Sequence, residues 1–135
     1  MSKVILITGA SSGIGAMTAK FLAEKGHKVY GTSRKPKGNG PGFQLLKLDV
    51  QDVQSIENAV ASILEEEGRL DVLINNAGMG ITGPIEETPT EEMRKVFETN
   101  FFGAIDVMKA VLPQMRKQKQ GLIINITSIA GYMGL

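Results

Sequence analysis

Three glycines near the N-terminus have the types and spacing of a phosphate-binding turn. Gly9, Gly13 and Gly15 stand between an apolar run at 4–7 and a segment with helical spacing at 16–25. Glycine lets the chain turn tightly and lets a phosphate approach the backbone without meeting a Cβ atom. Free N–H groups at the start of the next helix would hold the anion. The alternative is a tight strand-to-helix turn without a ligand. The residues expected to contact the ligand here are Gly9, Ser11, Ser12, Gly13, Ile14 and Gly15.

A basic segment, Ser33-Arg34-Lys35, ends the second predicted strand. Folds that bind NAD usually carry an acidic side chain at this point, which binds the ribose 2′-hydroxyl. A guanidinium can instead hold a 2′-phosphate through paired hydrogen bonds. The segment therefore favours NADP(H) over NAD, with Arg34 as the main contact and Ser33 in support. The alternative is a solvated basic loop.

Polar side chains also follow three later strands or interrupt a helix. Asp49-Val50 ends the third strand, and Asn75-Asn76-Ala77-Gly78 ends the fourth. Asn100 lies in the middle of an apolar helix face, where we expect it to be buried and hydrogen-bonded, as a kink site with water or as part of a proton path. Ser128 ends the fifth strand. Taken singly, the strand-end residues are compatible with ordinary turns, and Asp49 with a turn or helix cap.

The elements that must position these residues alternate along the chain. Helical spacing and caps predict helices at 16–25, at 52–67, and from Thr88 onward, where Thr88 and Glu91 would form a capping box with Pro89 between them. Pro113 should kink this last helix or end its regular part. The strands are predicted at 4–7, 28–33, 43–50, 69–75 and 121–127.

Strands that alternate with helices predict an α/β fold of the Rossmann type, a doubly wound parallel sheet. Right-handed crossovers give the strand order 3-2-1-4-5, with the sheet truncated after its fifth strand. Ligands should then bind at the carboxyl ends of strands 1 and 4, where the winding changes direction. The glycine turn and Asn75–Gly78 both lie there.

Length and composition predict one domain over residues 1–135. The formal net charge of +1 gives no indication of nucleic-acid binding, and the absence of cysteine excludes disulfides and thiolate metal sites. The one histidine, His27, is expected in a solvated loop, so no metal is predicted. The N-terminal apolar run is too short for a signal peptide and no stretch is long enough to span a membrane, which makes a cytoplasmic location the expectation.

The segments Thr8–Gly15, Leu48–Val50, Asn75–Gly78, Thr99–Gly103 and Ile126–Gly131 together resemble the short-chain dehydrogenase/reductase family, in the same order and over nearly the whole chain. The resemblance implies reversible hydride transfer between a nicotinamide and an alcohol or carbonyl carbon. It implies that Asp49 contacts the adenine and that Asn76, Ala77 and Gly78 lie beside the cofactor. It further implies that Ser128 hydrogen-bonds the reacting oxygen and that the Asn100 backbone carbonyl holds a water in the proton path.

The match breaks at the acid/base pair. The family uses a Tyr with a Lys four residues later, and this sequence has no such pair. Tyr132 is only four residues after Ser128 and is expected to line the substrate side of the loop 129–134. We therefore expect the chain to be an incomplete short-chain enzyme, with the strand at 121–127 as a bare apolar sheet edge and part of the long helix uncovered.

Three hypotheses follow. The first is an NADP(H)-dependent oxidoreductase represented by its cofactor-binding half, with little or no turnover on its own. The second is a non-catalytic dinucleotide sensor, and the third is an interaction protein that inserts its open edge strand into a partner. The apolar loop at 129–134 indicates a hydrophobic alcohol or ketone, such as a steroid or retinoid. Resemblance alone implies a homo-oligomer.

Overall fold

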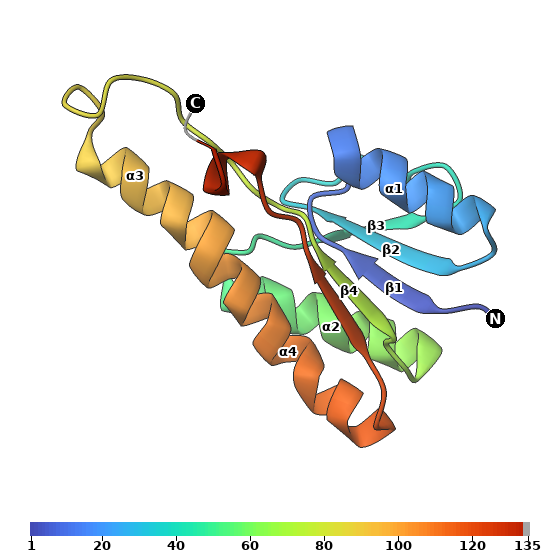
Figure 1. Ribbon diagram of the computed structural model, residues 1–135. Coiled ribbons are helices and arrows are strands. Elements are labelled where there is room, and N and C mark those ends of the chain that lie inside the picture. The colour runs from blue at the N-terminus through green and yellow to red at the C-terminus, as the bar shows by residue number, and fades with distance from the viewer. Residues whose placement is uncertain (134–135) are drawn as a thin grey trace.

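The computed structural model describes residues 1–133 and contains one parallel sheet in the order β3-β2-β1-β4-β5 (Figure 1). The fold class and the strand order predicted from the sequence are confirmed. The third, fourth and fifth strands are shorter than predicted, so that Asp49 and Val50 lie beyond the end of β3. The strands are β1 (Val4–Ile7), β2 (Lys28–Ser33), β3 (Gln44–Lys47), β4 (Val72–Asn75) and β5 (Leu122–Asn125).

Helices cover both faces of the sheet (Figure 1). Helix α1 (Gly13–Glu24) lies on one face, and α2 (Val53–Glu67) lies on the other beside a long helical rod. The rod consists of α3 (Thr90–Phe97), a π-helical turn η1 (Glu98–Phe102) and α4 (Gly103–Gln118). A short 3₁₀ helix, η2 (Ile129–Gly131), follows β5.

The core has two parts because successive strand side chains point to opposite faces. On the α1 face, Ile5 and Ile7 of β1 pack with Ala19 of α1. On the other face, Leu6 packs with side chains from α2 and α4, among them Ile56 and Val111. Leu6, Ile56 and Val111 are fully shielded from solvent, so the sheet is anchored on both faces.

The ring of Phe43 fills the α1-side core next to β2 and β3, where a crossover helix would otherwise pack. Residues 34–43 connect these two parallel strands without a helix. Phe43 is only 5% exposed and packs into the α1-side core. Its ring lies against two glycines, since a Cβ atom at Gly40 would be 2.0 Å from Phe43 Cζ and one at Gly31 would be 3.2 Å from Phe43 Cε2.

The long rod differs from the sequence prediction at two positions. The capping box at Thr88 is wrong, because the Thr88 hydroxyl donates to the Pro84 carbonyl (2.9 Å) and helix α3 begins at Thr90, with Pro89 as its N-cap. An end to the helix at Pro113 is also wrong, because α4 continues to Gln118. The buried residues Val111 and Met115 hold the segment around Pro113 against the core, which outweighs the one backbone hydrogen bond that proline removes.

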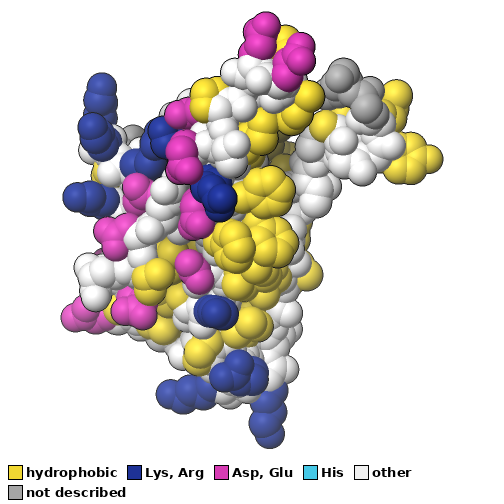
Figure 2. All heavy atoms as spheres, turned by 90° about the vertical axis from the view of Figure 1, so that its left-hand side faces the viewer, with side chains coloured by type: hydrophobic (Ala, Val, Ile, Leu, Met, Phe, Trp, Pro, Cys, Tyr) yellow, Lys and Arg dark blue, Asp and Glu magenta, His cyan; other side chains and the backbone are white. Residues whose placement is uncertain are grey.

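The expected uncovered apolar surface is confirmed. Phe97, Phe101 and Phe102 are 62%, 53% and 49% exposed, and the rings of Phe101 and Phe102 pack edge to face. On β5, Leu122 and Ile124 are also exposed. Figure 2 shows hydrophobic side chains gathered in a patch on the face that carries the rod, with charged residues at its border.

Two further observations concern the sequence predictions. His27, predicted to be a solvated loop residue, is half-buried, and its Nδ1 accepts a hydrogen bond from the Lys3 N–H at 3.0 Å. In the part of the chain that the structure describes, no helix has the length and apolar character that a membrane crossing requires.

Candidate functional site

The glycine turn after β1 is joined to the end of β4 by a set of buried polar contacts. The Thr8 hydroxyl accepts from the backbone N–H groups of Asn76 and Ala77, each at 3.0 Å. The Asn76 side-chain amide donates to the carbonyls of Thr8 (3.1 Å) and Gly9 (3.0 Å). The Asn76 side chain therefore braces the end of β4 against the end of β1.

Two of the glycines are required by close approach. A Cβ atom at Gly9, which has φ +66°, would lie 2.9 Å from Ala77 Cα. At Gly15 a Cβ atom would lie 2.2 Å from the Gly9 carbonyl oxygen. A side chain at Gly9 would push the turn away from the segment after β4, and a side chain at Gly15 would push α1 away from the turn.

The N-terminus of α1 is prepared for an anion. Ser12 is the N-cap in an extended conformation, and its hydroxyl makes no capping hydrogen bond. The first turn of the helix contains no acidic side chain. Because the first N–H groups of a helix lack partners within the helix and carry its positive dipole end, this terminus favours a phosphate.

A cleft of about 1030 Å³ runs along the carboxyl ends of β1, β2, β3 and β4. It brings together most of the residues predicted to bind a cofactor, while Gly13 and Gly15 support the turn from outside its lining. Sequence reasoning did not single out Lys47, Gln51 and Thr99, which also line it. The predicted residues in the lining are Gly9, Ser11, Ser12, Ile14, Ser33, Arg34, Asp49, Val50, Asn76, Ala77 and Gly78.

Asp49 forms a turn at the edge of this cleft. Its Oδ1 accepts from the Gln51 N–H at 2.9 Å, and its own N–H donates to the Ser55 hydroxyl at 2.9 Å. Asp49 therefore forms a turn, as the alternative interpretation predicted, and also lines the cleft. A carboxylate fixed in this way is held in one orientation at the rim.

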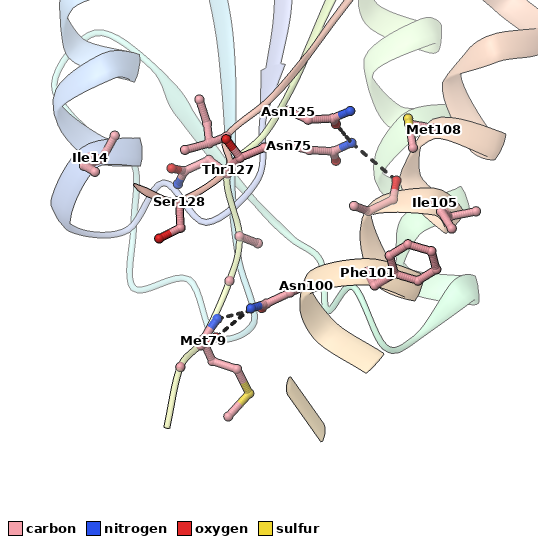
Figure 3. A pocket seen from close by; sticks show the side chains of 16 residues that line it. Ile14, Asn75, Met79, Asn100, Phe101, Ile105, Met108, Asn125, Thr127 and Ser128 are labelled. Carbon is pink, nitrogen blue, oxygen red and sulfur yellow. Dashed lines mark hydrogen bonds between the residues drawn. The ribbon is translucent and has the colours of Figure 1, made fainter. Parts of the chain in front are cut away.

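A second cleft of about 640 Å³ lies beside the first and contains both predicted catalytic residues (Figure 3). Asn100 reaches it from η1 and Ser128 from the segment after β5. Ile14 and residues 76–79 line both clefts, so a ligand long enough to leave the first would enter the second.

Asn100 is exposed, not buried as predicted, because nothing packs over this part of the rod among the described residues. Both ends of its side-chain amide are bonded to Met79: Nδ2 donates to the Met79 carbonyl (2.7 Å), and Oδ1 accepts from the Met79 N–H (2.8 Å). The side chain therefore fixes the loop that follows Gly78 to the π-helical turn (Figure 3). A π turn inside a helix is frequently found at functional sites.

The Ser128 hydroxyl can still donate a hydrogen bond. It accepts a hydrogen bond from the Ala130 N–H at 3.1 Å as the N-cap of η2, which leaves its own proton available for donation into the second cleft. Tyr132 is 92% exposed. Of the apolar loop expected on the substrate side, residues 129–133 are described and Gly134 lies outside the described residues.

Asn75 and Asn125 pair at the floor of the second cleft. Asn75 Nδ2 donates to Asn125 Oδ1 (2.9 Å) and to the Ala104 carbonyl at the start of α4 (3.3 Å) (Figure 3). This contact ties β4, β5 and α4 together next to Asn100. The contact follows from the register of β4 and β5, in which Asn75 and Asn125 are direct partners.

Among residues 1–133, no group of three or more His, Cys, Asp or Glu side chains is arranged to hold a metal ion. The polar groups that line the two clefts are hydroxyls, amides, backbone N–H groups, the carboxylates of Asp49 and Asp52, and the cations Arg34, Lys35 and Lys47.

The family model for short chain dehydrogenases matches residues 3–135. With the parallel sheet and the glycine turn described above, this shows that the chain belongs to the short-chain dehydrogenase/reductase family of oxidoreductases, as its sequence motifs predict.

Named relatives and a solved structure agree with that assignment. The chain is 55% identical over 133 residues to 3-ketodihydrosphingosine reductase of Bacteroides thetaiotaomicron, covering 98% of this chain and 49% of the relative. It is 38% identical over 147 residues to retinol dehydrogenase 8 of Homo sapiens, covering 98% and 46%. The structure of ElxO with NADP bound matches with a TM-score of 0.91 and 34% identity, covering all of this chain and 59% of that one. The chain thus spans about half the length of the curated relatives it matches.

Proposed function

We propose that the protein is an NADP(H)-dependent oxidoreductase that interconverts a carbonyl and an alcohol, and that residues 1–135 form its cofactor-binding domain. The observation that carries the proposal is the single cleft in which Arg34 and Ser33 lie with the glycine turn and the open N-terminus of α1. Such a cleft offers separate anion contacts for the pyrophosphate and for a 2′-phosphate.

The residues present fit a dinucleotide. Ser11, Ser12 and the first N–H groups of α1 would hold the pyrophosphate, and Gly13 leaves open space where its Cβ would stand. Asp49 and Val50 would border the adenine, and residues 76–78 the adjoining ribose. Arg34 would hold the 2′-phosphate with Ser33 in support, which is why we favour NADP(H) over NAD. The NADP-bound ElxO structure supports the same choice.

The second cleft would hold the reacting carbonyl. When bound, the nicotinamide supplies or accepts the hydride. The Ser128 hydroxyl donates a hydrogen bond to the carbonyl oxygen and so stabilises the negative charge that develops there. Asn100 keeps the loop at Met79 in place beside the substrate. We propose that the proton donor is the family's Tyr, with its Lys, in the part of the full protein that corresponds to the relatives' other half.

For the substrate we propose a long-chain ketone of the 3-ketodihydrosphingosine type. The relative with that activity in its name is 55% identical to this chain. The second cleft suits a lipid chain, because much of its lining is apolar. Its apolar lining includes Ile14, Met79, Phe101, Ile105, Met108 and Ile126. A homo-oligomer and a cytoplasmic location stay predictions.

The test is a reductase assay with the purified full-length protein, in which the consumption of NADPH is measured with 3-ketodihydrosphingosine and, for comparison, with retinal. We expect turnover with the sphingoid ketone, and a loss of roughly 100-fold or more in kcat when Ser128 becomes Ala. The matched control, Ser128→Thr, keeps a hydroxyl and should retain more activity. Binding of NADPH without turnover of either carbonyl compound would contradict the enzyme proposal and favour the dinucleotide sensor.

A further inference from the structure

The short connection between β2 and β3 leaves one corner of the cofactor cleft open. Residues 34–43 contain no helix, Phe43 packs in the α1-side core, and the carboxyl end of β3 is exposed. The residue at that end is Lys47, which is exposed and lines the same cleft as Ser33 and Arg34.

The strand register places Lys47 next to Ser33. The two residues are direct partners in the parallel β2–β3 pair, and neighbouring strands lie about 4.8 Å apart. Side chains two positions apart on a strand share a face, so Lys47 is on the side of Leu45, which packs in the α1-side core. Ser33 is on that side too, two positions after Gly31, whose missing Cβ faces Leu45 and Phe43.

The cations at this corner have no competing partners in the described chain. No carboxylate of residues 1–133 lies within 4.0 Å of the charged groups of Arg34, Lys35 or Lys47. The two acids of the cleft are engaged elsewhere: Asp49 accepts from the Gln51 N–H, and Asp52 accepts from Gln54 and Ser55 as the N-cap of α2. The corner therefore presents cations without ion-pair partners among residues 1–133, and such groups suit a phosphate monoester.

We propose that Lys47 is a second residue that determines specificity for the 2′-phosphate, acting from β3 opposite Arg34 on the β2 side. This inference rests on the proposed NADP(H) function. Arg34 offers a planar, paired contact, whereas Lys47 offers a mobile point charge with three donors. NAD lacks the phosphate and gains nothing from either cation. Lys47 thus selects between the two cofactors without touching the parts that they share.

The experiment measures dissociation constants by calorimetry for the full-length protein with NADPH, NADH, 2′,5′-ADP and 5′-ADP. In Lys47→Gln we expect NADPH and 2′,5′-ADP to bind about 10-fold more weakly, with NADH and 5′-ADP unchanged, since a hydrogen bond to a charged group is lost. Lys47→Arg should recover most of the affinity. Lys37→Gln is the matched control, because Lys37 is exposed in the same connection but does not line the cleft, and it should change affinity less than about twofold.

The outcomes separate this inference from the proposed function. If Arg34→Gln lowers the preference for NADPH and Lys47→Gln does not, the role of Lys47 is wrong and the NADP(H) proposal stands. If neither variant changes the ratio of the NADPH and NADH constants, both are wrong. An equal loss for NADPH and NADH in Lys47→Gln would also overturn the inference, because a 2′-phosphate contact cannot affect NADH.

Discussion

Two hydrogen bonds join Thr8 to Asn76: the Asn76 N–H donates to the Thr8 hydroxyl at 3.0 Å, and the Asn76 side-chain amide donates to the Thr8 carbonyl at 3.1 Å. Thr8 is 1% exposed, so water does not compete for these contacts. This reciprocal pair joins the glycine turn after β1 to the end of β4. It therefore fixes the distance between the two strand ends that border the cofactor cleft.

Replacing Thr8 tests the pair. In Thr8→Val the shape is kept, but the N–H groups of Asn76 and Ala77 lose their acceptor, so we expect the free energy of unfolding to fall by about 2–4 kcal/mol. Thr8→Ser keeps the hydroxyl and should lose much less. Urea denaturation of the three proteins measures the difference, and equal stability of Thr8→Val and wild type would show that the contact is not used.

Phe43 should be among the most sensitive core positions, because its ring replaces a crossover helix. We expect Phe43→Ala to lower the free energy of unfolding by about 3–5 kcal/mol. The comparison is Phe21→Ala on the outer face of α1, where the ring is 55% exposed and the loss should be about 0.5 kcal/mol. If urea denaturation gave similar losses of unfolding free energy for the two variants, the Phe43 ring would not be an important part of the core.

The hydrogen bonds between Asn100 and Met79 predict a graded effect on the loop. Asn100→Asp keeps the acceptor for the Met79 N–H but loses the donor to its carbonyl, while Asn100→Ala loses both. Hydrogen exchange at the Met79 amide should therefore become faster in the order wild type, Asp, Ala. Global stability should change by only about 1 kcal/mol, since the side chain is exposed. Unchanged Met79 exchange in Asn100→Ala would contradict this role.

Asp71 should give the stability a dependence on acid pH. Burial opposes ionisation of its carboxyl, but hydrogen bonds from Arg69 and from the Val4 N–H, at 2.8 Å, hold the pKa of Asp71 below its ordinary value. The folded protein thus binds this proton more weakly than the unfolded chain. The stabilisation is complete above the unfolded pKa of about 3.9 and is lost as the pH falls towards the folded value.

The check is the free energy of unfolding as a function of pH. Asp71→Asn should be less stable near neutral pH by about 1–3 kcal/mol and should lose less stability than wild type on acidification. An Asp71→Asn profile parallel to wild type would show that the folded and unfolded pKa values of Asp71 are equal.

The sheet, its helices and most of the cofactor cleft could be predicted from the sequence, because the local patterns and the right-handed crossover rule lead to the same fold. The apolar run before Gly9, the helix after Gly15 and the amides after β4 each predict their own element. The right-handed crossover rule then brings their ends to one edge of the sheet. The same rule also places Ser33 and Arg34, at the end of β2, in the lining of the cleft.

The remaining features depend on contacts that the local sequence pattern does not predict. The Thr88 hydroxyl donates to the Pro84 carbonyl, and no side chain caps α3. The capping pattern in the sequence does not predict this alternative hydrogen bond. Lys47 becomes relevant only once the register with Ser33 is known. Asn100 was expected to be buried because of its apolar neighbours, but those neighbours, Phe101 among them, are themselves exposed in the described chain.

The most direct test of the central claim is the ratio of the NADH and NADPH dissociation constants of the full-length protein, measured by calorimetry. We expect NADPH to bind at least about 10-fold more tightly than NADH, since Arg34 would make a charge-assisted contact with the 2′-phosphate alone. Equal or tighter binding of NADH, or no binding of either nucleotide by the folded protein, would contradict the assignment of this cleft to NADP(H).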